Sequence, residues 1–170
     1  MNQISEEKLA TTRISVTYEL EPTENIVGDL SGLIGQFCDS FVGAFYPRVV
    51  SRKANVVVTE LFNNAVAHNT DGNSRIRVSL GLVDGSMKVR VMSAATPDQA
   101  DELKYRLAEM RDAADQRAML AHTIRDRHAR KLAGGLGLMR LVVENKFSLS
   151  SKYRDGELTM EAQLDLGGLT

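Results

Sequence analysis

A short stretch in the first half of the chain pairs a carboxylate with a carboxamide. Glu60 precedes Asn64 by four residues, so the two side chains would lie about 40° apart on a helix. A carboxylate in that position can orient or deprotonate a hydroxyl, and an amide oxygen can bind a hard cation. Taken alone, the pair is more typical of a surface helix with two solvated polar residues. The neighbouring positions carry apolar residues at helical spacing, which predicts a buried face beside the pair: Val50, Ala54, Val57, Val58, Leu61 and Ala65.

A second motif lies some seventy residues later and is rich in glycine. It reads Gly134-Gly135-Leu136-Gly137-Leu138 and is followed by an apolar run. Glycines let a backbone approach a phosphate closely, and the amides of the helix that follows attract anions. A lone turn of this kind is more often a plain loop before a helix.

The order of the two motifs resembles that of the Bergerat-fold (GHKL) ATP-binding superfamily, which includes histidine kinases, gyrase and Hsp90. The resemblance implies one histidine-kinase-like ATPase domain over residues 1–170, with ATP and Mg²⁺ as cofactors. It implies that Asn64 binds the magnesium ion. The glycine motif would then close over the phosphates, with Gly134, Gly135, Leu136, Gly137 and Leu138 as nucleotide-binding residues.

Within that superfamily, the pattern Glu60-x-x-x-Asn64-Ala-Val-x-His68 is most similar to the anti-sigma-factor serine/threonine kinases of bacteria. These proteins act in partner-switching systems and phosphorylate, or bind, small STAS-domain antagonist proteins. The resemblance implies an ATP- and magnesium-dependent serine/threonine kinase in which Glu60 activates the hydroxyl of the partner. It also implies a homodimer.

One departure from the family pattern opens an alternative. Family members carry Asp-x-Gly-x-Gly after the central strands, and its Asp recognises adenine, but residues 89–98 of this chain contain no such motif. Ser93 and Thr96 are the polar candidates in its place. A subfamily of SiaB-like partner-switching kinases resembles this chain in that loss. The alternative function is a protein that binds nucleotide weakly or not at all and sequesters a protein partner.

Composition narrows the class of protein. A chain of 170 residues is enough for one domain with a single core. Its 21 basic and 22 acidic residues nearly cancel, which argues against a nucleic-acid partner. Cys38 stands alone and is expected to be buried as a small apolar residue. The polar start and the lack of a long apolar run predict a cytoplasmic protein that does not enter the membrane.

Periodicity predicts the elements that must hold the two motifs. Strands are expected at 13–20, 75–83, 87–94, 146–153 and 158–166, with Asp-Gly hairpin turns at 84–85 and 155–156. Helices are expected at 25–45, with Thr23 as N-cap, and from Pro47 to about Asn69, followed by a turn at 70–73. Together these elements predict an α+β two-layer sandwich, a mixed, mostly antiparallel sheet with helices on one face.

The segment from Asp98 to Lys131 has helical spacing but two open interpretations. It is either a lid or a helix for dimerisation and partner binding, or an amphipathic helix packed on its own domain. Arg125, Arg127, Arg130 and Lys131 either face a triphosphate or form a solvated basic helix end. For His68 the sequence favours a structural role at a helix end over metal binding.

Overall fold

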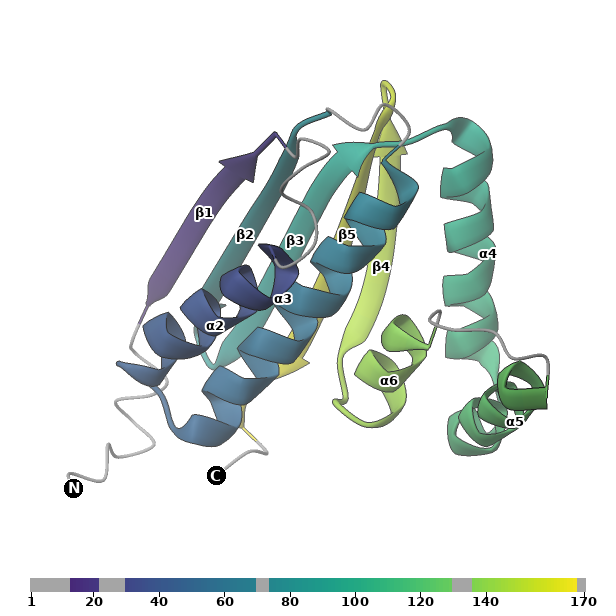
Figure 1. Ribbon diagram of the computed structural model, residues 1–170. Coiled ribbons are helices and arrows are strands. Elements are labelled where there is room, and N and C mark those ends of the chain that lie inside the picture. The colour runs from purple at the N-terminus through teal and green to yellow at the C-terminus, as the bar shows by residue number, and fades with distance from the viewer. Residues whose placement is uncertain (1–12, 22–29, 70–73, 130–135, 168–170) are drawn as a thin grey trace.

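Five strands form one antiparallel sheet in the spatial order β1-β2-β3-β5-β4 (Figure 1). The structure is a computed structural model, and it describes residues 13–21, 30–69, 74–129 and 136–167. The strands are β1 (Ile14–Leu20), β2 (Ile76–Val83), β3 (Ser86–Ala94), β4 (Ser148–Arg154) and β5 (Glu157–Asp165). All five predicted strands are confirmed to within two residues. Every pairing between the described strands is antiparallel, so this sheet lacks the parallel component of a mixed sheet.

Two tight turns set the register of the sheet. Asp84 and Gly85 join β2 to β3 with φ angles of 50° and 70°. Asp155 and Gly156 join β4 to β5 with φ angles of 53° and 83°. Positive φ at both central residues is the requirement of the two-residue hairpin turn that matches strand twist, and Asp-Gly meets it at low cost. Both predicted hairpins are therefore confirmed.

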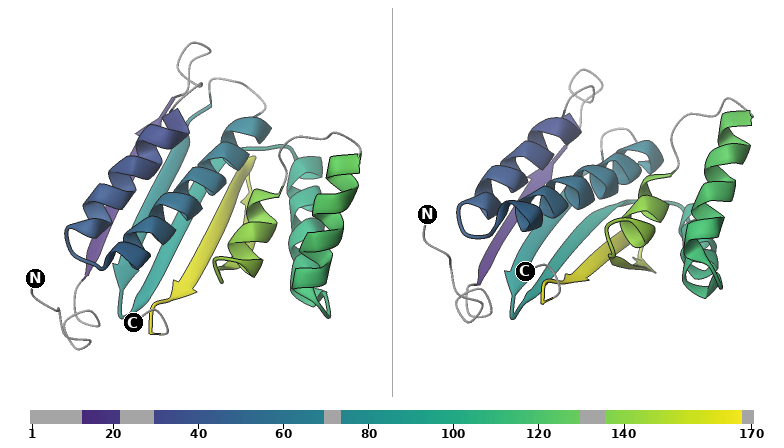
Figure 2. Two further views of the ribbon diagram at one scale, coloured as in Figure 1. Left: turned by 60° about the horizontal axis from the view of Figure 1, so that its bottom comes forward. Right: turned by 90° about the horizontal axis from the view of Figure 1, so that it is seen from below.

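Three helices cover one face of the sheet (Figure 2). They are α2 (Leu30–Gly43), α3 (Arg48–His68) and α6 (Gly137–Val143). The other face carries polar side chains, among them those of Thr17, Ser79 and Lys88. Along β2, β3 and β5 the buried residues alternate with accessible ones, because successive side chains point to opposite faces of a strand. The predicted α+β sandwich with helices on one face is confirmed.

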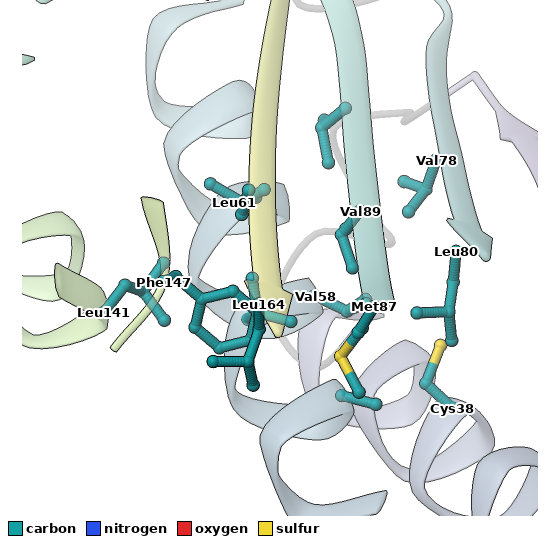
Figure 3. Close-up of a cluster of buried hydrophobic side chains, with 14 of the residues drawn as sticks. Cys38, Val58, Leu61, Val78, Leu80, Met87, Val89, Leu141, Phe147 and Leu164 are labelled. Carbon is teal, nitrogen blue, oxygen red and sulfur yellow. The ribbon is translucent and has the colours of Figure 1, made fainter. Parts of the chain in front are cut away.

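The core lies between that sheet face and α3. Figure 3 shows Val58 and Leu61 of α3 directed toward Val89 of β3, with Leu141 of α6 and Phe147 on the far side of the cluster. The apolar stripe predicted for the motif helix is fully buried. Cys38 is also buried, at 0% exposure, as its sequence context predicted.

The described part of the segment from Asp98 to Lys131 folds as two helices rather than one. They are α4 (Pro97–Asp112), which runs beside β4, and α5 (Gln116–Ala129), which returns beside α4 and contacts α6 (Figures 1 and 2). Thr96 begins α4 with a reciprocal capping box, in which its hydroxyl accepts from the Gln99 amide. Ala100 and Met110 of α4 are buried, which favours the interpretation of a helix packed on its own domain.

Some sequence expectations lie outside the described residues. These are the first residues of the helix expected from Asn25, its N-cap Thr23, and the turn at 70–73. In the part of the chain that the structure describes, no helix combines the length and the apolar character that crossing a membrane requires.

The two long helices meet at a glycine. A Cβ atom built on Gly35 of α2 would lie 2.3 Å from Thr59 Oγ1 and 2.8 Å from Asn55 Oδ1, both on α3. The Thr59 hydroxyl is held in place by a hydrogen bond that it donates to Asn55 Oδ1 at 3.3 Å. The absence of a side chain at Gly35 therefore sets how closely α2 approaches the helix that carries Glu60 and Asn64.

Gly35→Ala should destabilise the protein by about 1–3 kcal/mol, because overpacking this contact outweighs the gain in helix propensity. Urea unfolding would measure the change. Gly81→Ala is the matched control, since a Cβ there meets no atom within 4 Å, and its effect should stay within about 0.5 kcal/mol. Equal losses at both positions would contradict the close contact of α2 with α3.

Candidate functional site

The carboxylate of Glu60 lies against the backbone of Gly137. A Cβ atom built on Gly137 would be 1.8 Å from Glu60 Oε2 and 2.6 Å from its Cδ, so no larger residue fits there without a shift. Glu60 is in the middle of α3, and Gly137 is the first residue of α6. The two motifs, far apart in sequence, therefore meet at this point.

Asn64 occupies the next turn of α3 on the same side. Its side-chain Nδ2 donates a 2.6 Å hydrogen bond to the carbonyl oxygen of Glu60. That bond uses the donor end of the amide on the helix itself and leaves Oδ1 as the end that faces away. An amide oxygen is a ligand that hard cations accept, so the Oδ1 of Asn64 has the chemistry of a cation ligand.

Asn64 and Leu138 line one cavity between α3, the sheet and α4. Leu138 of α6 is buried. Leu136 is described as the residue that precedes α6, whereas Gly134 and Gly135 lie outside the described residues. The structure thus brings Asn64, Gly137 and Leu138 together with Glu60. The cavity is lined by Asn64, Ala65, His68, Val91, Ser93, Gln99, Glu102, Leu103, Arg106, Leu138, Leu158 and Met160.

Lysine side chains hold the C-terminal end of α6 in place. Lys53 Nζ donates a 2.9 Å hydrogen bond to the carbonyl oxygen of Asn145, and Lys146 Nζ donates one of 2.7 Å to that of Val143. Burial, with Lys146 nearby, lowers the pKa of Lys53. No pattern in the sequence predicted that Lys53 would join α3 to the end of α6. This bond helps to fix the position of Gly137 relative to Glu60.

The environment of Glu60 makes its carboxylate a stronger base than an exposed one. Partial burial raises the pKa of Glu60, and the positive charge of Arg140, one turn along α6, acts in the opposite direction. Burial is the larger of the two effects. A glutamate whose pKa is raised toward neutrality is suited to accept a proton from a hydroxyl.

Ser93, a polar candidate from the segment in which the sequence lacks Asp-x-Gly-x-Gly, lines the cavity. It lies near the end of β3 and is 5% exposed. Thr96, the other polar candidate, caps α4 and does not line the cavity. A buried hydroxyl can exchange one or two hydrogen bonds with a ligand, but it does not supply the negative charge of a carboxylate.

Helix α4 narrows the cavity. Gln99, Glu102, Leu103 and Arg106 of α4 form one wall, and Glu102 and Arg106 form an ion pair of 3.0 Å. The remaining cavity has a volume of about 30 Å³, whereas pockets for small molecules usually measure about 300–1,000 Å³. With α4 in this position the cavity leaves no room for a nucleoside.

The sequence did not identify Arg106 as a residue of the cavity. Of the basic cluster before the glycine motif, Arg125 and Arg127 lie on α5 and do not line the cavity, and residues 130 and 131 lie outside the described residues. The sequence showed that charged residues recur along α4, but it did not show which of them face the cavity. His68, expected to be structural, is the last residue of α3 and lines the cavity while exposed.

Metal binding at this site would depend on more than side chains. No group of three or more His, Cys, Asp and Glu residues among those described could hold a metal ion. Magnesium usually keeps several waters and takes one or two protein ligands together with phosphate oxygens. Asn64 therefore fits as a single protein ligand to a phosphate-bound Mg²⁺ ion, and not as part of a cage made by the protein.

Comparison with solved structures identifies a similar fold. The chain superposes on a chain of the crystal structure of the SiaB-SiaC complex from Pseudomonas aeruginosa, with a TM-score of 0.68. The two share 15% sequence identity, and the match covers 88% of each chain. At this identity the similarity establishes a shared fold. No protein-family profile matches the sequence, and no curated protein matches it.

The contact between Glu60 and Gly137 can be tested by a double-mutant cycle. Gly137→Ala should destabilise the protein by about 1–3 kcal/mol, because the added methyl group displaces the carboxylate. In a Glu60→Ala background the same change should have little effect, giving a coupling energy of about 1 kcal/mol or more. Chemical denaturation of the four proteins measures it. Additive effects would mean that the two residues are not in contact.

The raised pKa of Glu60 predicts how stability depends on pH. The folded state holds this proton more tightly than the unfolded chain, whose glutamates titrate near about pH 4.3. The stabilising contribution is therefore complete below that pH and is lost as the pH rises through the folded-state pKa. Glu60→Gln should gain stability relative to the parent as the pH increases from about 4 to about 8. A pH-independent difference between the two unfolding free energies would contradict this environment.

Proposed function

We propose that the protein is an ATP- and magnesium-dependent serine/threonine protein kinase of a bacterial partner-switching system. The contact between Glu60 and Gly137 is the observation that carries the proposal. It joins α3, which carries Glu60 and Asn64, to the start of α6, which belongs to the glycine motif. The resemblance to GHKL anti-sigma-factor kinases requires that these two motifs meet. Chemistry of this kind needs positioning and charge neutralisation more than covalent participation by the protein.

Glu60 is the proposed catalytic residue. When bound, MgATP would supply the γ-phosphoryl group, with ADP as the leaving group of the broken P–O bond and Mg²⁺ neutralising the charge that develops. Glu60 accepts the proton of the serine or threonine hydroxyl as the O–H bond breaks, so that the oxygen can bond to phosphorus. Partial burial favours this role because it raises the pKa of the carboxylate. Its position against Gly137 holds the base next to the start of α6.

Asn64 and the start of α6 are the proposed binding residues. Asn64 offers Oδ1 to the magnesium ion, since its Nδ2 is already bonded to the helix. The backbone around Leu136 and Gly137 faces the phosphates, where a side chain at Gly137 would collide with Glu60. Leu138 forms the apolar wall beneath them. Gly134 and Gly135 complete the turn in this proposal.

The proposed substrate is a protein. The similar fold was crystallised as a complex of SiaB with SiaC, which supports a protein partner for this chain. By resemblance to the anti-sigma-factor kinases, we propose a small STAS-domain protein as the phosphoacceptor. Such a system operates in the cytoplasm, which is the location we propose.

A second function is favoured by the narrow cavity. Because α4 fills much of the pocket and Ser93 replaces a carboxylate, a nucleotide could enter only if α4 moved outward. If α4 stays in place, the same fold serves as a nucleotide-free module that binds and sequesters its partner. The two functions differ in a single measurable property, the affinity for ATP.

Thermal unfolding with ATP and Mg²⁺ distinguishes the two functions. Free ATP at 100 times its Kd should stabilise the kinase by about 2.7 kcal/mol, and hydrogen exchange in α4 should increase. Asn64→Ala should remove the part of this stabilisation that depends on magnesium. Glu60→Gln should still bind ATP but lose transfer of phosphate to a co-purifying STAS-type protein. Gly81→Ala, far from the cavity, serves as the control for both measurements.

Two results would contradict the kinase. The absence of any stabilisation by saturating ATP and magnesium would favour the sequestering module. A Glu60→Gln protein that phosphorylates its partner at the parent rate would show that this carboxylate is not the base.

A further inference from the structure

Arg140 is a cation near the Glu60 carboxylate that pairs with no described acid. It follows Gly137 by three residues on α6, so the two residues share one side of that helix. That side meets α3 at Glu60, because a Cβ atom on Gly137 would overlap the carboxylate. The Arg140 side chain is exposed. Among the described residues its guanidinium forms no ion pair, either with Glu60 or with another acid.

The other cations around the site are already engaged. Lys53 and Lys146 each donate a hydrogen bond to a backbone carbonyl at the end of α6. Arg106 of α4 pairs with Glu102 at 3.0 Å. A cation in such a contact must give it up before it can bind a ligand. Arg140 has no such contact in the described part of the chain, so its guanidinium can meet an incoming anion without that loss.

The backbone of Arg140 is fixed relative to α3. Its carbonyl oxygen accepts hydrogen bonds from the Glu144 N–H at 2.9 Å, from the Asn145 N–H at 3.1 Å and from Asn145 Nδ2 at 3.3 Å. The carbonyl oxygen of Asn145 accepts the bond from Lys53 of α3. The start of the Arg140 side chain is therefore tied to the helix that carries Glu60. This tether keeps the guanidinium within reach of one side of the site, which is the kind of positioning that catalysis requires.

Glu60 and Arg140 together suit a group that carries both a proton and negative charge. The carboxylate can accept the proton of a hydroxyl, and the planar guanidinium can donate two hydrogen bonds to phosphoryl oxygens. Burial raises the pKa of Glu60, and the charge of Arg140 lowers it, so the guanidinium is near enough to act on the carboxylate. A serine or threonine hydroxyl that is receiving a phosphoryl group presents both features at once.

We propose that Arg140 is a second catalytic residue, whose guanidinium binds the oxygens of the phosphoryl group as that group passes to the acceptor hydroxyl. This role rests on the proposed kinase function and adds a residue to it. Neither sequence motif assigns Arg140 a part. The role follows from its place beside Glu60, from its tethered backbone and from its unpaired charge.

The charges of the two residues change in step with the transfer. The O–H bond of the acceptor breaks and its proton goes to Glu60, while the oxygen bonds to phosphorus and the P–O bond to ADP breaks. Arg140 keeps its proton throughout, because a guanidinium stays charged at neutral pH. Before transfer the carboxylate offsets the charge of Arg140. Once Glu60 has taken the proton its carboxyl group is neutral, and the full charge of Arg140 acts on the phosphoryl oxygens.

Binding of a phosphoryl analogue tests this role without a protein substrate. Thermal unfolding should show that MgADP with aluminium fluoride stabilises the parent protein more than MgADP alone. Arg140→Gln should bind MgADP as the parent does but bind the aluminium fluoride complex about tenfold or more weakly. Arg140→Lys should retain part of that affinity, because it keeps the charge and loses the planar fork. Arg154→Gln removes an exposed arginine that pairs with Asp155, and it should match the parent.

Titration of Glu60 provides a second readout that requires no nucleotide. Carbon NMR of the glutamate carboxyl groups should show a higher pKa for Glu60 in Arg140→Gln than in the parent, because the charge that lowers it has been removed. Arg140→Lys and Arg154→Gln should leave that pKa near the parent value. Loss of a purely structural contact would not produce this charge-dependent pattern. Circular dichroism confirms that each variant is folded, as expected for exposed side chains.

Four results would overturn the proposal. If Arg140→Gln binds the aluminium fluoride complex as tightly as the parent, Arg140 has no part in transfer, and the proposed kinase function stands without it. If Arg140→Gln loses affinity for MgADP alone to the same extent, Arg140 binds nucleotide and does not act on the transferring group. An unchanged pKa of Glu60 in that variant would mean that the two residues are not neighbours. A parent protein that binds no MgADP would exclude the kinase function and this role with it.

Discussion

The candidate site depends on one close approach, that of the Glu60 carboxylate to the backbone of Gly137. Glu60 is positioned by the buried stripe of α3, and Gly137 by the short helix α6, whose far end is tied to α3 through Lys53. Because α6 has only seven residues, it has little stability of its own and takes its position from these contacts. A side chain at residue 137 would separate the acid from the start of α6, because its Cβ atom would collide with the Glu60 carboxylate.

The same constraint, a helix surface without a side chain, recurs at Gly35. There α2 comes close enough to α3 to meet Thr59 and Asn55, which lie one turn apart on the helix that carries Glu60. The glycines therefore act at two levels. Gly35 sets the packing of the helical layer, and Gly137 sets the geometry of the site built on it. In each case the requirement is space, since neither Gly35 nor Gly137 has a positive φ.

The structure brings the two sequence motifs together beside a narrow cavity. Glu60 lies against Gly137, and Asn64 and Leu138 line a cavity whose other walls include Ser93 and α4. This combination is the physical basis for weighing a kinase against a sequestering module. The outer margin of the sheet presents a different problem, that of an exposed apolar stripe beside an open strand edge. The exposed apolar residues of α2 form a surface separate from the cavity.

Local patterns in the sequence determined the strands, the Asp-Gly turns and the motif helix, because alternation, helical spacing and positive φ are properties of neighbouring residues. The convergence of Glu60 with the glycine motif was inferred from resemblance, and tertiary structure places Glu60, Gly137 and Leu138 together. Tertiary structure alone decided that Lys53 binds the end of α6, that Arg106 rather than Arg125 lines the cavity, and that Phe37 remains half-exposed. Those outcomes depend on which faces meet across the fold. A side chain's burial is set by its neighbours in space, and periodicity along one helix does not identify them.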